Sequence, residues 1–459
     1  MSPEESPRLS ACRSNFPSVP NFVRRLRFDE LPIDVVAQVR RCLLDLIGVA
    51  VAGSRTDGSQ LACRHAAAHM RGSDGQPRIL LDGRRASPAG AAFAGAAMLD
   101  SFDAHDGHVL VKGHVGVATL PALLAFVDSG LACDGREFVT CMVVGYEVGT
   151  RAGIAMHSTV ADYHCSGSWN CLASAAVGSR LLGATEEQIR HAFGIAEYWG
   201  TRGQMMRVCD SPSMVKDGSS WGAHAGVTAA LLARDGFTGA PAITVERDDV
   251  ATIWSDLGTR WRIREQYFKP YPVCRWAQPA IEAALSLQRR ERFTARDVAK
   301  ITIESFHEAV VLGAACAIPQ DTDQAQYSLT YPVAAALVFG RLGAPEIAMP
   351  SLADPDVHRL LLSMELVESD EFSRRFPAER WARVRIALHD GRSLTSSPAI
   401  ARGNPENPLT DDEIRGKYRS FAEPVLGKER TLRIERAVDD LIDDPSAQRT
   451  LLGALLEAA

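Results

Sequence analysis

Between residues 31 and 239, the chain is a succession of helical segments with almost no strand-like alternation. Residues 31–53 place apolar side chains at helical spacing and end at a glycine. Alanine and glycine dominate residues 87–99, as expected where helices pack too closely for larger side chains. Further helices are predicted over 118–130, 136–157, 168–183 and 219–239. This run restricts the larger part of the fold to packed helices.

The pattern changes after about residue 270. Residues 299–306 alternate apolar and polar side chains, and Asp390-Gly391 lies between two extended runs, which is typical of a hairpin. After Pro398 the pattern is helical again, with a capping box from Thr410 to Glu413. We therefore predict a mainly α fold: one large all-helical domain formed by both ends of the chain (1–270 and 399–459), with a smaller α/β lid domain (271–398) inserted.

Composition excludes several classes of partner. The net charge of −6 provides no global field for nucleic acid or an anionic membrane. Ten cysteines occur without a CxxC pair, which indicates reduced thiols rather than a disulfide framework. Neither a signal peptide nor an apolar run of roughly 18 residues is present. We expect a cytoplasmic protein with no nucleic-acid or membrane partner.

The densest group of titratable side chains lies in residues 99–120, directly after the alanine-rich helix. We call residues 99–120 the Asp/His segment. Aspartate and histidine interleaved with glycine at a helix exit indicate binding or proton transfer. The alternative is a polar surface loop whose aspartates cap helices. The segment contains Asp100, Asp103, His105, Asp106, His108, Lys112 and His114.

Three other polar segments lie beside apolar helices. His164 precedes one helix whose amides can hold an anion, and Lys216 precedes another. A loop stiffened by two prolines presents Lys269, Cys274 and Arg275 at the predicted domain boundary, where small-molecule sites are common. Tyr331 begins a helix of the smaller domain. Singly, each has an ordinary structural explanation: a capped histidine, a solvated lysine or a tyrosine that anchors a helix.

Several sharper motifs are incomplete or missing. Ser213 and Lys216 match SxxK, but the companion SDN and KTG elements of that serine-hydrolase class are absent. No GxSxG elbow, Walker A loop or strand-embedded GxGxxG occurs. Histidines and aspartates of the 99–120 segment could ligate a metal, but they lack the helical i, i+4 histidine pair of common zinc enzymes. We predict no metal and no cofactor.

The order of these segments resembles the 2-methylcitrate dehydratase (MmgE/PrpD) family, which also includes cis-aconitate decarboxylases and iminodisuccinate epimerases. The resemblance covers most of the chain. It runs through DLIGVAVAG, the Asp/His segment, GYEVGTRAG, the His164 segment, SMVKDG, GFTGAPA, FKPYPVCR and Tyr331 to GNPENPLT.

The resemblance implies a large helical domain, a smaller α/β lid and usually a homodimer. It also implies that Asp103, His114, His164, Lys216, Lys269 and Tyr331 line the active site. We assign catalytic roles to Asp103, His114, His164 and Lys216, and substrate-binding roles to Asp106, Lys269, Cys274, Arg275 and Tyr331.

Four positions differ from the family's usual pattern and leave the exact substrate open. Val115 follows His114 where relatives commonly have proline, and Ala104 replaces a second aspartate. Ser219 occupies a position that is often histidine, and Cys274 replaces a histidine of the decarboxylases.

The predicted function is a cofactor-independent lyase, a dehydratase or decarboxylase, acting on a small di- or tricarboxylic acid. Lysine and arginine bind substrate carboxylates, and Arg275 can do so through a bidentate fork. His164 or His114 serves as acid/base, Asp103 orients a histidine, and Lys216 or Tyr331 donates a proton, with lid closure completing the site. The alternatives are an isomerase or epimerase on the same scaffold, a non-catalytic homologue and, less favoured, a lysine–pyridoxal enzyme.

Overall fold

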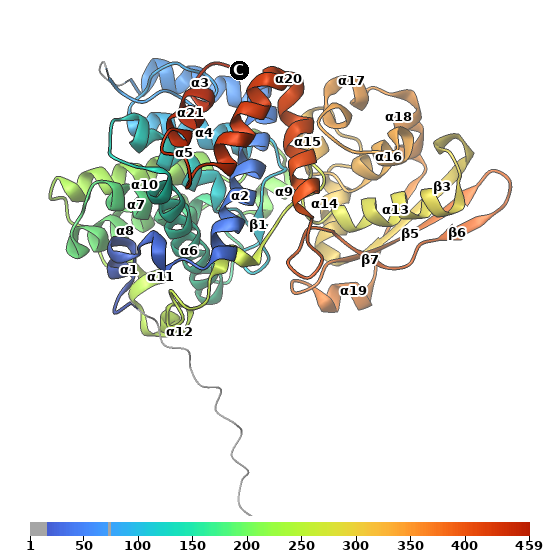
Figure 1. Ribbon diagram of the computed structural model, residues 1–459. Helices are drawn as coiled ribbons and strands as arrows, with labels where there is room; N and C mark the ends of the chain where they lie inside the picture. The colour runs from blue at the N-terminus through green and yellow to red at the C-terminus, as the bar shows by residue number, and fades with distance from the viewer. Residues whose placement is uncertain (1–15, 72–74) are drawn as a thin grey trace, which may run out of the picture.

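The computed structural model describes residues 16–71 and 75–459, and these form a mainly α protein. Figure 1 shows a larger helical part beside a smaller part that contains the main sheet, with the C-terminal helices returning to the larger part. The predicted fold class is confirmed. None of the helices in the described ranges is long and apolar enough to cross a membrane.

The larger part consists of helices from both ends of the chain. They are α1 (Val19–Arg25), α2 (Ile33–Gly53), α3 (Asp57–His69), α4 (Pro88–Asp100), α5 (Gly116–Asp128), α6 (Gly135–Thr159), α7 (Gly167–Leu181), α8 (Glu186–Trp199), α9 (Met206–Asp210), α10 (Ser219–Arg234), α11 (Ile243–Glu246), α12 (Ala251–Trp254), α20 (Asp411–Asp439) and α21 (Ala447–Leu455). A two-stranded pair, β1 (Gly107–His108) and β2 (Gln266–Tyr267), joins two of its connecting segments.

Small residues let the central helices approach closely. Helix α7 packs between α6 and α10. A Cβ atom added at Gly226 of α10 would lie 2.2 Å from the carbonyl oxygen of Cys171 in α7, so only glycine fits there. The alanine and glycine content seen in the sequence therefore reflects backbone contact between helices.

The smaller part surrounds a mixed sheet in the order β4-β3-β5-β6, with β7 also paired to β5. Strands β3 and β5 are antiparallel, and the hairpin predicted at Asp390-Gly391 joins β5 to β6. Its elements are α13 (Gln278–Glu291), β3 (Val298–Ser305), α14 (His307–Ala315), α15 (Thr322–Gln326), α16 (Thr330–Phe339), α17 (Met349–Leu352), α18 (Pro355–Leu362), β4 (Met364–Glu368), α19 (Asp370–Arg375), β5 (Trp381–Leu388), β6 (Ser393–Thr395) and β7 (Ala399–Ile400).

The returning helix α20 packs against α2 and reaches the Asp/His segment. It begins with the predicted capping box of Thr410 and Glu413. Lys417 in α20 forms an ion pair with Asp45 of α2 at 2.6 Å and donates to the carbonyl oxygen of Ala104 at 2.5 Å. Helix α20 thereby supports the backbone of the segment that carries several residues of the candidate site.

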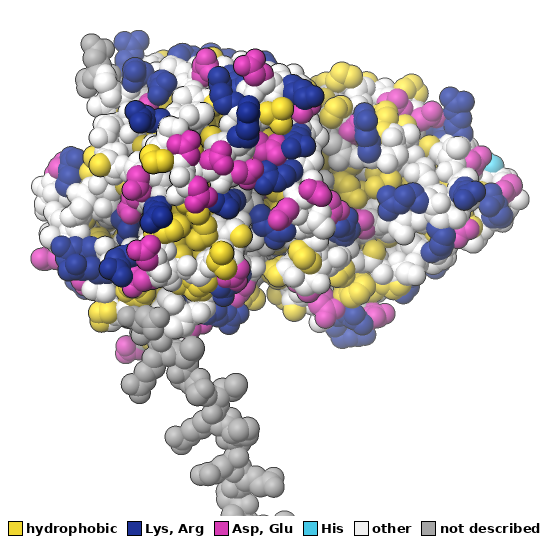
Figure 2. Space-filling view, viewed as in Figure 1, with side chains coloured by type: hydrophobic (Ala, Val, Ile, Leu, Met, Phe, Trp, Pro, Cys, Tyr) yellow, Lys and Arg dark blue, Asp and Glu magenta, His cyan; other side chains and the backbone are white. Residues whose placement is uncertain are grey.

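Charges of both signs are interspersed over the surface seen in Figure 2, on the helical and the α/β part alike. This distribution agrees with the modest net charge and creates no broad field of one sign on this face.

A buried ion pair anchors the segment that leads to β2. Arg151 and Glu147 of α6 are fully buried and 3.4 Å apart, and Arg151 also contacts Asp256 at 2.5 Å.

We expect Arg151→Met to lower the free energy of unfolding by about 3–5 kcal/mol, because it leaves Glu147 buried without its partner. Urea denaturation measures the change. The control, Arg296→Met, removes an exposed pair and should cost at most about 0.5 kcal/mol; equal losses in both variants would contradict the prediction.

Candidate active site

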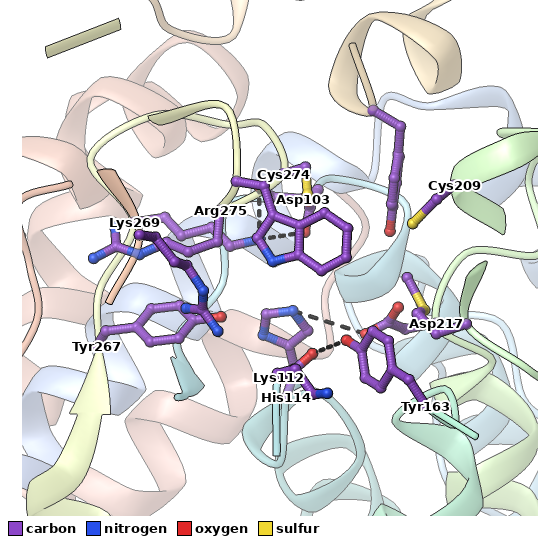
Figure 3. Close-up of a pocket in the computed structure, with 14 residues that line it drawn as sticks. Asp103, Lys112, His114, Tyr163, Cys209, Asp217, Tyr267, Lys269, Cys274 and Arg275 are labelled. Carbon is purple, nitrogen blue, oxygen red and sulfur yellow. Dashed lines mark hydrogen bonds and ion pairs between the residues drawn. The ribbon is translucent and has the colours of Figure 1, made fainter. Parts of the chain in front are cut away.

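A small cavity lies where the Asp/His segment, the turn before α10, the loop after β2 and the smaller part meet (Figure 3). Its volume is about 30 Å³, more than the roughly 10–15 Å³ that a single water needs. It is lined by Asp103, Lys112, His114, Tyr163, Met205, Cys209, Asp217, Tyr267, Lys269, Cys274, Arg275, Trp276, Tyr327 and Arg380. The cavity is narrow, and most of the side chains that line it are buried.

Two short strands place the Asp/His segment beside the Lys269 loop. Gly107 pairs with Tyr267 in the antiparallel β1–β2 register. The His108 ring reinforces this pairing, because its Nε2 atom lies 2.9 Å from a carboxylate oxygen of Glu265. The pairing brings residues more than 150 positions apart to the same wall of the cavity.

Asp103 and Lys269 form a buried ion pair in that wall. Burial raises the pKa of Asp103, but the charge of Lys269 and the other positive groups outweigh this effect and lower it overall. Burial lowers the pKa of Lys269, but Asp103, Tyr267 and Cys274 together raise it overall. The side-chain oxygen of Gln326, in the smaller part, accepts a hydrogen bond from the backbone N–H of Asp103 at 2.7 Å. Both groups are therefore charged and held in place.

His114 presents one defined nitrogen to the cavity. Its Nδ1 lies 2.5 Å from the backbone carbonyl oxygen of Asp106. Because a carbonyl only accepts, Nδ1 carries the proton and Nε2 keeps its lone pair. Burial, followed by the charge of Lys269, lowers the pKa of His114 to about 3. The imidazole is neutral at physiological pH and can accept a proton from a bound molecule.

Asp217 faces His114, with its Oδ2 atom 3.8 Å from the histidine Nε2 (Figure 3). It accepts a hydrogen bond from the Ser166 hydroxyl at 2.7 Å. Burial is the largest cause that raises the pKa of Asp217.

Three cations of the cavity wall, Lys112, Arg275 and Arg380, form no ion pair with any carboxylate of residues 16–71 and 75–459. The Arg275 guanidinium donates to neutral acceptors, including Asn404 Oδ1 at 2.6 Å, and lies over the Tyr267 ring. Arg380 is 8% exposed and its Nε has no hydrogen-bond partner. Uncompensated buried positive charge favours an anionic ligand.

One group of side chains has the composition of a metal site. Ligand atoms of Asp103, His105 and His114 lie within 4.8 Å of one another. However, the Lys269 ammonium already pairs with Asp103, and it would repel a metal ion at the same place. The donor set therefore fits an ammonium partner better than a metal ion.

Five of the nine predicted site residues line this cavity: Asp103, His114, Lys269, Cys274 and Arg275. Asp106 does not line it. Its fully buried carboxylate accepts from the Tyr146 hydroxyl at 2.5 Å, and burial raises the pKa of Asp106 to about 7. Asp106 contributes to the site through its backbone carbonyl, which holds His114.

The other three residues lie outside the cavity wall. His164 has its Nδ1 2.9 Å from the carbonyl oxygen of Asp162. Lys216 forms an ion pair with Asp323 of α15 at 2.7 Å, which links the two parts of the protein. The Tyr331 hydroxyl donates to the carbonyl oxygen of Glu346 at 2.5 Å within the smaller part. The catalytic and substrate-binding roles of these residues remain predictions.

Sequence reasoning missed most of the remaining lining residues. Asp217 and Tyr163 adjoin residues that the motifs singled out, so a wider reading of those motifs would have included them. Tyr327, rather than Tyr331, supplies the tyrosine from the 327–331 stretch. No local sequence pattern marks Arg380 as a site residue, because it directly precedes β5 and reaches the cavity only through the tertiary fold.

Comparison with known proteins identifies the class to which this fold and site belong. The MmgE/PrpD N-terminal domain model matches residues 18–257, and the MmgE/PrpD C-terminal domain model matches residues 271–442. The chain therefore belongs to the MmgE/PrpD family.

The relatives that align over nearly the whole chain include two proteins from Aspergillus species. The cis-aconitate decarboxylase-like protein oryM of Aspergillus oryzae is 28% identical, with 95% of this chain and 96% of the relative aligned. The cis-aconitate decarboxylase of Aspergillus terreus is 25% identical, with 91% of each aligned. A third, the 2-methylcitrate dehydratase of Cupriavidus necator, is 31% identical over 49% of this chain and 50% of the relative.

Proposed function

We propose that this protein is a cofactor-independent lyase that removes CO₂ or water from a small di- or tricarboxylic acid. The observation that carries this proposal is a set of cations, Lys112, Arg275 and Arg380, that form no ion pair within the described part of the chain. They surround a largely buried cavity that also holds His114 and the Lys269–Asp103 pair. Full-length similarity to decarboxylases makes decarboxylation the first reaction to test. The relatives named above support a lyase and give no support to the epimerase alternative.

The residues of the cavity suit this chemistry. The cations hold the substrate carboxylates and stabilise the enolate-like charge that develops when a carboxylate or an α-proton leaves. In decarboxylation, the C–C bond breaks, its electron pair stays on carbon, and a proton later replaces CO₂. In dehydration, His114 Nε2 takes the α-proton and the hydroxyl leaves as water after protonation. Exclusion of bulk water strengthens each of these interactions.

We infer that the smaller part moves to admit substrate, because the cavity is narrow and most of the side chains that line it are buried. The Lys216–Asp323 ion pair and the contacts of Gln326 with the Asp/His segment hold the closed form. We infer that residues 271–398 act as a lid, and that Lys216 and His164 act at the edge of the site as it opens and closes.

Product analysis tests the reaction class. Purified protein is incubated with cis-aconitate, 2-methylcitrate and related acids in deuterated water, and products are identified by mass spectrometry and NMR. Net loss of CO₂ or water is the expected result. Exchange of the α-hydrogen without net loss would support the epimerase alternative, and binding without any reaction would support a non-catalytic homologue.

The contribution of Arg380 can be measured separately. We expect Arg380→Gln to raise KM by roughly 10- to 100-fold with a smaller change in kcat, because it removes one charge-assisted contact to a substrate carboxylate. Steady-state kinetics on the substrate found above give the values. Arg392→Gln, in the exposed β5–β6 hairpin, is the control and should match wild type; an unchanged KM in Arg380→Gln would contradict the role.

We also infer a cytoplasmic homodimer. The sequence argument for the cytoplasm is the reduced-cysteine pattern, and the family resemblance implies the dimer. Exposed apolar side chains near α3 and α10 support an interface there: Leu61 (48% exposed), Met214 (51%), Val215 (68%) and Trp221 (49%). Light scattering after gel filtration tests the oligomeric state, and a monomer at micromolar concentration would exclude a stable dimer.

A further inference from the structure

The turn before α10 directs Asp217 into the cavity. Lys216 and Gly218, on either side of it, both have positive φ angles, +50° and +65°. The backbone carbonyl of Asp217 accepts from the N–H of Gly167 at the start of α7 at 3.0 Å. With the backbone tied to α7, the side chain lies in the cavity wall beside His114 (Figure 3).

The Asp217 carboxyl group is only half satisfied. Its Oδ2 atom accepts from the Ser166 hydroxyl, whereas its Oδ1 atom is buried and has no hydrogen-bond partner. The residue is 3% exposed. A buried carboxylate oxygen without a partner is costly, and the cost falls when that oxygen carries a proton or meets a ligand.

We propose that Asp217 is the proton donor of this site, and that its carboxyl group delivers the proton to substrate from a position beside His114. The inference rests on the proposed lyase function. It names a residue that neither the motifs nor the family resemblance assigned, and it supplies a donor inside the cavity, where Lys216 and Tyr331 do not lie.

The surroundings of Asp217 favour its protonated form more than water does. Burial and the charge of Asp103 raise the pKa of this group to about 6, and the Ser166 hydroxyl, Lys269 and Lys216 partly oppose the rise. A bound substrate carboxylate adds another negative charge and raises the pKa further. The titratable or charged groups that face Asp217 are Asp100, Asp103, His114, Tyr163, Cys209, Lys216, Lys269, Cys274 and Tyr327.

The proton transfer balances for either lyase reaction. In decarboxylation, the electron pair left on carbon after CO₂ departs takes the Asp217 proton to form the new C–H bond. In dehydration, the Asp217 proton joins the leaving hydroxyl to form water while His114 Nε2 holds the α-proton. Asp217 becomes a carboxylate in both cases and regains a proton from solvent when the site opens.

Asp217→Asn tests the proposal, because asparagine can still accept from Ser166 but cannot deliver an acidic proton. We expect kcat to fall by roughly 10²- to 10⁴-fold. We expect KM to change by at most about threefold, which corresponds to roughly 0.7 kcal/mol of binding free energy. In the wild type, kcat falls as pH rises through the pKa of the donor carboxyl, because the acid form is required. The residual activity of the variant should lack this alkaline loss.

Asp210→Asn is the matched control, since Asp210 is an exposed carboxylate only seven positions away and does not line the cavity. We expect it to keep wild-type kcat and pH profile. A second variant, Asp217→Ala, should recover part of its activity on addition of formate, a small acid that can enter the space left by the side chain. Thermal unfolding shows that each variant is folded.

Two results would overturn the proposal. One is a folded Asp217→Asn variant that keeps wild-type kcat and its alkaline limb. The other is a loss of kcat in both Asp217 variants that parallels their loss of thermal stability and that formate does not relieve in Asp217→Ala. Failure of the lyase function itself is distinguishable, because the wild-type protein would then release neither CO₂ nor water from any acid tested.

Discussion

Replacing Lys269 with methionine is expected to reduce kcat/KM by roughly 100-fold or more, since a charge-assisted contact to substrate contributes about 1.5–3 kcal/mol and a second contact, to Asp103, is lost with it. The same change should lower the free energy of unfolding by about 3–5 kcal/mol, because Asp103 is left charged and buried without its partner. Steady-state kinetics and urea denaturation measure the two effects.

A double variant separates the two effects of Lys269. Asp103→Asn combined with Lys269→Met removes both charges, so we expect it to recover most of the lost stability, because no unpaired charge remains buried. It should not recover activity. If the double variant regained wild-type turnover, Lys269 would be a structural partner of Asp103 only, and its substrate-binding role would be wrong.

For dehydration, in which His114 Nε2 takes the α-proton, His114→Asn is expected to reduce kcat by roughly 10²- to 10⁴-fold. The asparagine amide can still donate to the Asp106 carbonyl oxygen, so the local backbone should persist while the accepting Nε2 is lost. His389→Asn, in the exposed turn between β5 and β6, is the control and should retain full activity. Full turnover in a folded His114→Asn variant would exclude His114 as the base.

The pH dependence follows from the low pKa of His114, about 3. A general base acts in its deprotonated form, and this histidine is almost entirely deprotonated at pH 5 and above. We therefore expect no loss of kcat due to His114 until the pH falls below about 4. An acid limb near the ordinary histidine range that disappears in His114→Asn would show that the residue titrates normally and would contradict this expectation.

Local patterns in the sequence determined much of the architecture. Helical periodicity and small-residue content predicted the helical part, and alternation with an Asp-Gly turn predicted β3 and the β5–β6 hairpin. The Thr410–Glu413 capping box marked the start of α20 correctly. These features depend on neighbours within a few positions, so the order of residues contains the necessary information.

The family resemblance and the polar motifs also located the main wall of the site. Asp103, His114 and Lys269 all line the candidate cavity, and their roles there stay predictions. The motifs could not decide which of several adjacent side chains faces the cavity. Asp217 rather than Lys216 lines it, and Tyr327 rather than Tyr331, because backbone dihedral angles and packing set the direction of each side chain.

The sequence by itself thus determined the helical and α/β elements, the family and several of the segments that form the candidate cavity. Only the tertiary structure decided that Arg380, more than 100 positions beyond Lys269, lines this cavity. It also decided that the Asp106 carboxylate is buried beside Tyr146, while the Asp106 backbone carbonyl accepts a hydrogen bond from His114. The physical reason is that local patterns specify helices and turns, whereas pairing of buried charges depends on distances between segments that no local pattern contains.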